Sequence, residues 1–116
     1  EKMLKLFTAI ATIAVASFNP SASSAGTMLA SWYGPDFHGR TTANGETYNM
    51  YGLTAAHKTL PFGTKLRVCY KSCVDVRIND RGPFIGAREL DLSYGAAQAV
   101  GLIDPGVASL SVTYLN

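Results

Sequence analysis

The ionisable side chains of this sequence gather in predicted loops and at the ends of predicted strands, where binding and catalytic groups concentrate on a rigid scaffold. The set holds carboxylates and imidazoles, the minimum needed for proton transfer at a glycosidic bond. No glycine-rich phosphate loop, helical histidine pair with a glutamate or nucleophile elbow occurs, and we expect neither a cofactor nor a metal site. The candidates are His38, Glu46, His57, Asp80, Arg81 and Asp91.

The elements that must position these residues are short strands separated by turns. Alternating polar and apolar residues predict strands, and a glycine-rich stretch between the first two apolar segments predicts a long loop. Ser93 is a suitable N-cap for one short helix that ends at Gly101. The pattern indicates a small β-barrel. The predicted strands are residues 28–33, 64–69, 74–78 and 110–115, with a brief apolar run at 53–56, a loop at 34–45, a turn at 79–83 and the helix at 94–100.

The two cysteines, Cys69 and Cys73, indicate a hairpin. Along one straight strand their α-carbons would lie about 13 Å apart, which is beyond disulfide reach. A tight turn at Lys71 brings them face to face, so we predict a disulfide between strands 64–69 and 74–78. A metal site is the weaker alternative, because two thiolates with no nearby histidine pair do not complete a tetrahedral set.

The first 25 residues have the layout of a secretory signal peptide. Lys2 and Lys5 precede an apolar run at residues 6–18, and Ser23 and Ala25 occupy the −3 and −1 positions of a cleavage site. The run is too short to span a bilayer as a helix. We predict a signal peptide at residues 1–25, cleaved after Ala25, and one domain at residues 26–116. A membrane anchor or a buried helix is the alternative.

Removing 25 residues from the 116 leaves a 91-residue chain with eight basic and seven acidic side chains. A net charge of +1 is too small to indicate nucleic acid or an anionic membrane as the partner. We expect an exported monomer, secreted or periplasmic, with no stable membrane anchor once the signal peptide is removed.

Six ordered motifs cover almost all of residues 30–114 and resemble the rare lipoprotein A family. They are ASWYG at 30–34, FHGRTTANGE at 37–46, LTAAH at 53–57, TLPFGT at 59–64, VRINDRGPF at 76–84 and LDLS at 90–93. The resemblance implies a mainly β fold, a six-stranded double-psi β-barrel with one or two short helices, which expansin and barwin domains share.

The resemblance also implies a lytic transglycosylase that acts on peptidoglycan glycan strands stripped of their peptides, at the septum. It would cleave the MurNAc–GlcNAc β-1,4 bond and leave 1,6-anhydro ends. Matched motif by motif, the functional residues of the family fall on Glu46, His57 and Asp80. We expect these three side chains to converge on one groove.

In this chemistry one group protonates the glycosidic oxygen and then, as a base, takes the proton of the C6 hydroxyl. Asp80 is our first choice, since a strand end holds a side chain firmly. Glu46 is alternatively an ordinary loop acid, and His57 a histidine that fixes a loop through hydrogen bonds. Arg81 is expected to point away, to hold substrate or to hold Asp91.

The remaining expectations concern substrate binding. Trp32 and Tyr33 alternate on the first strand, so one ring should lie in the core and the other in the groove. Asp91 is either a substrate contact or a buried carboxylate paired with an arginine. Many family members have an aspartate where this chain has Asn49, and an amide cannot transfer a proton. The residues predicted to bind substrate are Tyr33, His38, Asn44, Asn49, Arg81 and Asp91.

Asn49 therefore keeps a second function open, that of a non-catalytic glycan-binding or wall-loosening module like the expansins. A protein that binds another wall enzyme is a third possibility. Fold alone does not decide among the three.

Overall fold

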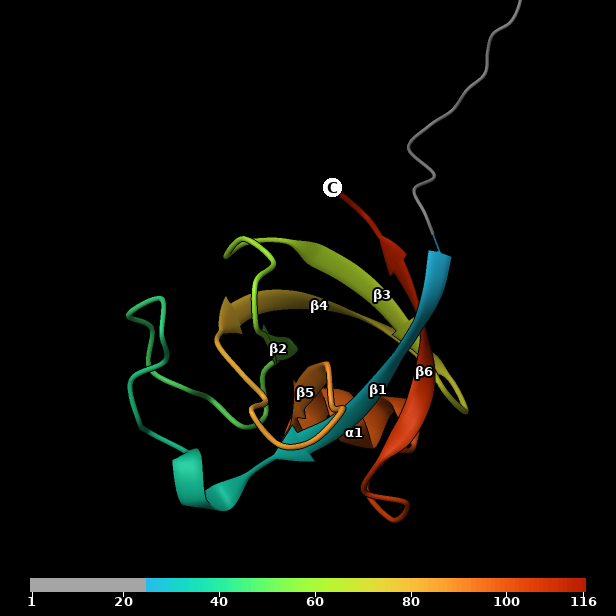
Figure 1. Ribbon diagram of the computed structural model, residues 1–116. Coiled ribbons are helices and arrows are strands. Elements are labelled where there is room, and N and C mark those ends of the chain that lie inside the picture. The colour runs from blue at the N-terminus through green and yellow to red at the C-terminus, as the bar shows by residue number, and fades with distance from the viewer. Residues whose placement is uncertain (1–24) are drawn as a thin grey trace, which may run out of the picture.

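The structure is a computed structural model that describes residues 25–116, and the predicted signal peptide lies outside these residues except for Ala25. Six strands close into a barrel in the order β1-β5-β2-β4-β3-β6 (Figure 1). The elements are β1 (Ala25–Tyr33), the 3-10 helix η2 (Pro35–Phe37), β2 (Thr54–His57), β3 (Lys65–Cys69), β4 (Cys73–Asp80), β5 (Leu90–Ser93), α1 (Tyr94–Val100) and β6 (Ala108–Tyr114).

Two parallel pairs, β1 with β5 and β2 with β4, lie among antiparallel pairs in this barrel. The predicted mainly β barrel with short helices is confirmed. The predicted strands have different ends, because pairing extends them: β1 begins at Ala25, which is opposite Thr113 of β6. The predicted turn at residues 79–83 was wrong for Asn79 and Asp80, which end β4. Strand β5 was not predicted.

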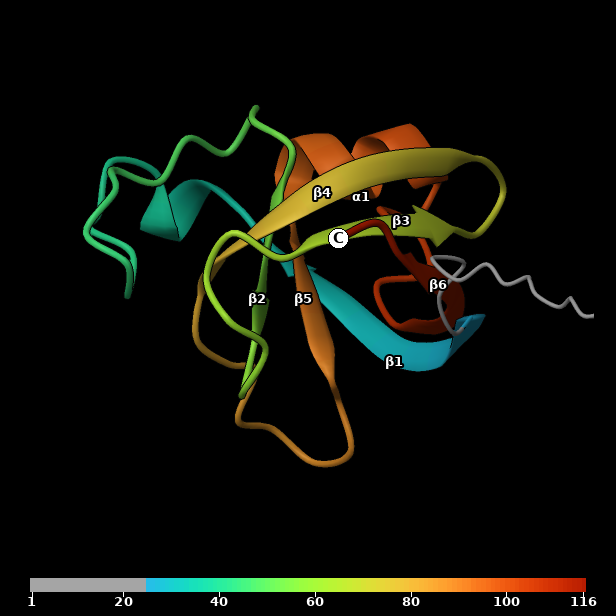
Figure 2. The same cartoon turned by 90° about the horizontal axis from the view of Figure 1, so that it is seen from above.

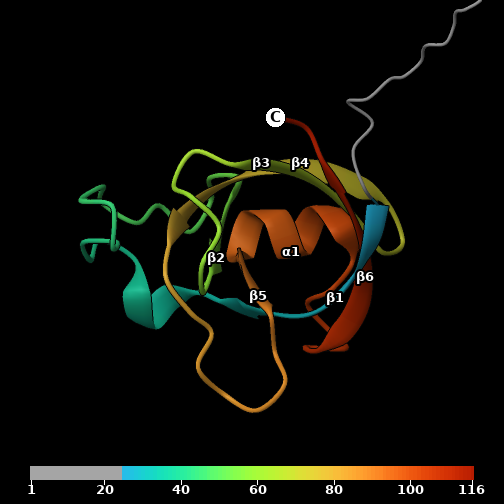
Figure 3. The ribbon, with the colours of Figure 1, turned by 45° about the horizontal axis from the view of Figure 1, so that its top comes forward.

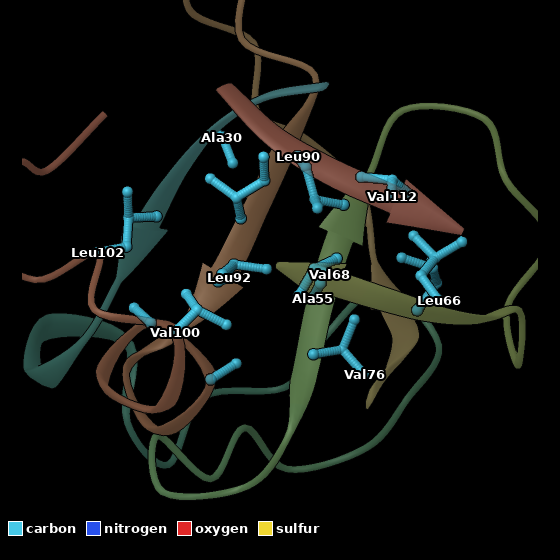
Figure 4. Packing of buried hydrophobic residues seen from close by; sticks show 14 residues of the cluster. Ala30, Ala55, Leu66, Val68, Val76, Leu90, Leu92, Val100, Leu102 and Val112 are labelled. Atoms are coloured by element: carbon cyan, nitrogen blue, oxygen red, sulfur yellow. The ribbon is translucent and has the colours of Figure 1, made fainter. Parts of the chain in front are cut away.

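Apolar side chains from all six strands and from α1 fill the barrel (Figure 4). Helix α1 lies across one end of the barrel and buries Ala96, Ala97 and Val100 against this core (Figure 3). Its N-cap is Ser93, whose hydroxyl accepts the N–H of Ala96, as predicted. Within residues 25–116, no helix is long and apolar enough to cross a membrane.

The predicted disulfide between Cys69 and Cys73 is present, and the two residues face each other at the ends of β3 and β4. The hairpin loop between them covers the end of α1. The N–H of Lys71 donates to the carbonyl of Val100 at 2.9 Å, and the Ser72 hydroxyl donates to the carbonyl of Ala99. The loop thus satisfies carbonyl groups that a helix C-terminus leaves unpaired.

Two long connections project from the barrel. Residues 34–53 join β1 to β2 and include η2, and residues 81–89 join β4 to β5 (Figures 1 and 2). The barrel fixes the ends of both connections, so side chains at those ends have defined positions.

Candidate active site

A pocket of about 320 Å³ lies where β1, β2, β4 and β5 meet the two long connections. Two carboxylates line it, that of Asp80 at the end of β4 and that of Asp91 in β5. Apolar and aromatic side chains form much of the remaining wall. The lining residues are Tyr33, Phe37, Ala56, Asp80, Arg81, Gly82, Pro83, Phe84, Ile85 and Asp91.

The strand register explains why the two carboxylates are neighbours. Strand β2 lies between β4 and β5, and Ala56 is paired with Asp80 on one side and with Asp91 on the other. Asp91 is in turn paired with Ser31 of β1. Adjacent strands lie about 4.8 Å apart, so the two aspartates are about 10 Å apart at the backbone. The methyl group of Ala56 leaves the space between them open.

Asp91 lies in a setting that favours the protonated acid. Burial raises the pKa of its carboxyl group, and the negative charge of Asp80 raises it further. The Ser31 hydroxyl donates to Asp91 Oδ1 at 2.9 Å, and this bond and the charge of Arg88 oppose the rise. The hydrogen bond to Asp91 thus comes from a serine and not from an arginine.

Asp80 is fixed by the backbone. Its Oδ1 accepts the N–H groups of Ala43 and Arg81, each at 2.9 Å. Ala43 belongs to the β1–β2 connection, so this carboxylate joins that connection to the end of β4. The orientation of Asp80 in the pocket is therefore set before any ligand binds.

Tyr33 places a buried hydroxyl beside the two acids. The hydroxyl has no hydrogen-bond partner among residues 25–116. Burial, followed by the charge of Asp80, raises the pKa of this phenol far above its usual range. The ring stacks on Tyr48, with centroids 4.5 Å apart. As expected for alternating rings, Trp32 packs against the core while Tyr33 lines the pocket.

Arg81 forms part of the pocket wall without pairing with Asp91. Its guanidinium lies over the ring of Phe62 at 3.9 Å from the centroid, and Nη1 donates to the carbonyl of His57 at 3.2 Å. A cation held this way over an aromatic face is favourable. Arg81 therefore fixes the start of the β4–β5 connection against the end of β2.

Glu46 lies outside the pocket lining, in a cluster of polar side chains. Arg77 donates to both of its oxygens, at 2.6 and 3.0 Å, and the amides of Asn79 and Asn44 donate at 3.1 and 3.0 Å. These bonds lower the pKa of Glu46 to about 2. We call Glu46, Arg77, Asn79 and Asn44 the clamp, because they fasten the β1–β2 connection to β4.

His57 and Asn49 accept hydrogen bonds within local turns, and His38 joins two parts of the β1–β2 connection. His57 Nδ1 accepts the N–H groups of Thr59 and Leu60, both at 3.1 Å, and burial lowers the pKa of this imidazole. His38 Nδ1 accepts the N–H of Met50 at 3.1 Å. Asn49 Oδ1 accepts the N–H of Tyr51 at 3.0 Å, a bond that an aspartate would also make.

The three residues expected to converge on one groove thus do not all line it. Asp80 does, while Glu46 is in the clamp and His57, the last residue of β2, directly follows the pocket-lining Ala56 without lining the pocket itself. Three residues of the site, Ser31, Ala56 and Phe84, were not predicted from the sequence. An apolar pair directly after Gly82-Pro83 was the available signal for Phe84. Within the described part of the chain, no group of three or more His, Cys, Asp or Glu side chains gathers as a metal site.

Comparison with known proteins relates residues 25–114 to the family described as lytic transglycolase. The chain is 58% identical over 87 residues to the probable endolytic peptidoglycan transglycosylase RlpA of Synechocystis sp., covering 72% of this chain and 27% of that protein. It is 52% identical over 91 residues to the endolytic peptidoglycan transglycosylase RlpA of Campylobacter jejuni, covering 76% and 33%. The chain thus spans about a quarter to a third of the length of these relatives.

Solved structures share the fold at low sequence identity. The expansin of Clavibacter michiganensis superposes with a TM-score of 0.65 and 22% identity, over 80% of this chain and 51% of that one. The Streptomyces papain inhibitor superposes with a TM-score of 0.66 and 19% identity, over 83% and 98%. The resemblance to rare lipoprotein A and the double-psi β-barrel fold are both confirmed by these comparisons.

Proposed function

The chain belongs to the lytic transglycolase family of double-psi β-barrels, and from that premise we propose that it is an endolytic peptidoglycan transglycosylase. Its substrate would be the glycan strand, cut at the MurNAc–GlcNAc β-1,4 bond. The observation that carries the proposal is the pair Asp80 and Asp91, placed on either side of Ala56 in one pocket.

The two carboxylates have different proposed roles, because their surroundings differ. The sequence favours Asp80 as the acid, whereas burial favours Asp91, whose pKa is raised. We therefore assign the proton to Asp91 and keep Asp80 in the catalytic pair as the charged carboxylate that stabilises positive charge developing at C1 of the muramyl sugar.

The proposed reaction needs no water. Asp91 donates its proton to the glycosidic oxygen as the C1–O bond breaks, and the N-acetylglucosamine leaves with a 4-hydroxyl group. The C6 oxygen then bonds to C1, and the Asp91 carboxylate takes the proton of the C6 hydroxyl. The product has a 1,6-anhydro end, and Asp91 is protonated again.

The other predicted site residues receive supporting roles in this proposal. Tyr33 lines the pocket and would contact substrate there, and Arg81 fixes the adjoining wall. Glu46 and Asn44 position the β1–β2 connection, whose Ala43 N–H holds Asp80. Backbone N–H groups donate to the side chains of His38, Asn49 and His57, and these hydrogen bonds would hold the β1–β2 and β2–β3 connections in place.

The setting of this activity is the bacterial cell envelope. Relatives named as peptidoglycan transglycosylases support a glycan substrate, and residues 1–25 support export through a signal peptide. We propose that the protein acts as a monomer in the periplasm or outside the cell.

A non-catalytic, wall-loosening module is the second candidate, and Asn49 is the residue that favours it. The amide cannot donate a proton as the aspartate that the family resemblance implies at this position could. Its observed bond to the Tyr51 N–H gives it a turn-forming role instead, which requires no acid. Catalysis through Asp91 would then not depend on the residue at position 49.

Digestion of peptide-free glycan strands, followed by mass spectrometry, tests the proposal. We expect products one water lighter than hydrolytic fragments, and their loss in Asp91→Asn and Asp80→Asn proteins that remain folded. Asp75→Asn is the matched control, because Asp75 is an exposed β4 aspartate paired with Arg67 outside the pocket. An absence of anhydro products from the unmodified protein would favour the non-catalytic module.

A further inference from the structure

Two adjacent apolar side chains are left in solvent at the edge of the acid pocket. Phe84 is 75% exposed and Ile85 is 61% exposed, and both line the pocket that holds Asp80 and Asp91. Exposed apolar side chains that border a pocket offer surface that a ligand can bury. Neither side chain contributes to the core of the barrel.

The segment that carries Phe84 and Ile85 is anchored at both ends. Before it, the guanidinium of Arg81 lies on Phe62. After it, the N–H of Arg88 donates to the carbonyl of Ile85 at 3.2 Å, and Lys58 Nζ donates to the carbonyl of Arg88 at 2.6 Å. The two apolar side chains are thus presented in a fixed place beside the carboxylates.

Gly82 helps to set the position of the Phe84 ring. Its φ of +124° lies in the region that favours glycine. A methyl group placed on Gly82 would stand 3.6 Å from the ring, so the ring lies directly against this residue. Phe84 therefore rests on backbone on one side and leaves its other surface to solvent.

The chemistry of this surface matches a sugar ring. A β-linked hexosamine carries its polar groups around its edge, and its two faces expose C–H groups. Aromatic rings bind such faces through their electron-rich surface and through burial of apolar area. A ring bound at Phe84 would continue directly into the space between Asp80 and Asp91, because all three line one pocket.

We propose that Phe84, supported by Ile85, is a stacking subsite for one hexosamine ring of a glycan strand, adjacent to the bond that is cut. The inference rests on the proposed function for the identity of the ligand. Phe84 is a substrate-binding residue in this proposal and takes no part in proton transfer.

Binding and cleavage can be measured separately. In an Asp91→Asn background, which we expect to bind without cutting, titration with peptide-free glycan oligomers by calorimetry gives Kd. We expect Phe84→Ala to weaken binding about three- to tenfold, and Phe84→Trp to restore it. In the cleaving protein the same Phe84→Ala change should raise KM more than it lowers kcat.

Tyr70→Ala is the matched control. Tyr70 is 42% exposed in the loop between Cys69 and Cys73, at the opposite end of β4 from Asp80. Its replacement should leave Kd, KM and kcat unchanged. Equal Kd values with and without the Phe84→Ala substitution would overturn the subsite even if the unmodified protein cuts glycan.

Failure of the proposed transglycosylase activity would give a different result from failure of the subsite. If the unmodified protein yields no anhydro product while Phe84→Ala still weakens glycan binding, the subsite stands and the reaction does not. If the Asp91→Asn protein binds no glycan oligomer, the subsite is overturned.

Discussion

Glu46 and Asp91 are carboxylates with opposite surroundings. In the clamp, Glu46 is 39% exposed at its side chain and receives hydrogen bonds from one arginine and two asparagine side chains, which lower its pKa to about 2. In the pocket, Asp91 is half-buried and receives one side-chain hydrogen bond, from Ser31, and its pKa is raised.

Under the proposed function, this difference would separate a structural acid from a reactive one within one barrel. Donors that surround a carboxylate stabilise its charged form, so Glu46 stays ionised and holds two segments together. Burial with a single side-chain donor destabilises the charged form, so the pKa of Asp91 is raised, the direction that the proposed general acid requires. The sequence motifs instead indicate Glu46 as a functional residue and Asp91 as a substrate contact or a buried carboxylate.

The largest expected effect is on catalysis through Asp91. Replacing Asp91 with asparagine removes the transferable proton and leaves an amide oxygen that can still accept from Ser31. General acid catalysis contributes about 10²- to 10⁴-fold, and we expect kcat on peptide-free glycan to fall by about 10³-fold. Rates are measured from the yield of 1,6-anhydro ends.

A Glu46→Gln protein is compared with Asp91→Asn in the same kcat measurement. If Glu46→Gln lost as much activity as Asp91→Asn while remaining folded, the division between a structural and a reactive acid would be wrong. We expect kcat in Glu46→Gln to fall less than about tenfold, since only the position of the β1–β2 connection changes.

The next largest effect is on stability, and here we expect substitution of Glu46 to cost more than substitution of Asp91. Glu46→Gln should lower the free energy of unfolding at pH 7 by about 1 kcal/mol, the scale of a partly exposed ion pair with its hydrogen bonds. The pKa of Glu46 is lowered on folding, so its stabilisation is complete above about pH 4.5 and is lost as pH falls toward about 2. Urea unfolding at several pH values measures both.

The pH dependence of urea unfolding also tests whether the charge of Glu46 holds the clamp together. The Glu46→Gln substitution should remove part of the acid destabilisation, so the unmodified and substituted proteins should converge in stability near about pH 2. A stability difference that is unchanged between neutral pH and that acid limit would mean that the charge of Glu46 does not hold the clamp together.

The sequence carries much of the fold, because local patterns decide many of its elements. Alternation over residues 74–78 predicts β4, and the spacing of Cys69 and Cys73 predicts the hairpin and its disulfide. Strand β5 has four residues and begins one ladder with β1, about 60 residues earlier, and another with β2. Such long-range pairing leaves no periodic signal in four residues.

The site residues likewise differ in how far the local sequence predicts them. Asp80 stands out from the sequence, because it lies where a predicted strand meets a turn rich in charged residues. The row Ser31, Asp91, Ala56 and Asp80 depends on the register of four strands, which form two parallel pairs that no hairpin fixes. The environment that distinguishes Asp91 from Glu46 is thus created by pairing that the sequence does not display.

The smallest effects come from removing one donor from each carboxylate. Ser31→Ala takes away the hydrogen bond that lowers the pKa of Asp91, so this acid keeps its proton to a higher pH. The alkaline limb of kcat/KM should move to higher pH, while kcat at the optimum changes less than about fivefold, the worth of one hydrogen bond.

Asn44→Ala takes away a donor to Glu46, whose pKa then rises, so acid unfolding should begin at a higher pH. Each substitution should move only one of the two profiles, activity for Ser31 and unfolding for Asn44, because the two carboxylates lie in separate hydrogen-bond networks. A shift of the alkaline activity limb in Asn44→Ala would show that the clamp sets the acidity of the pocket.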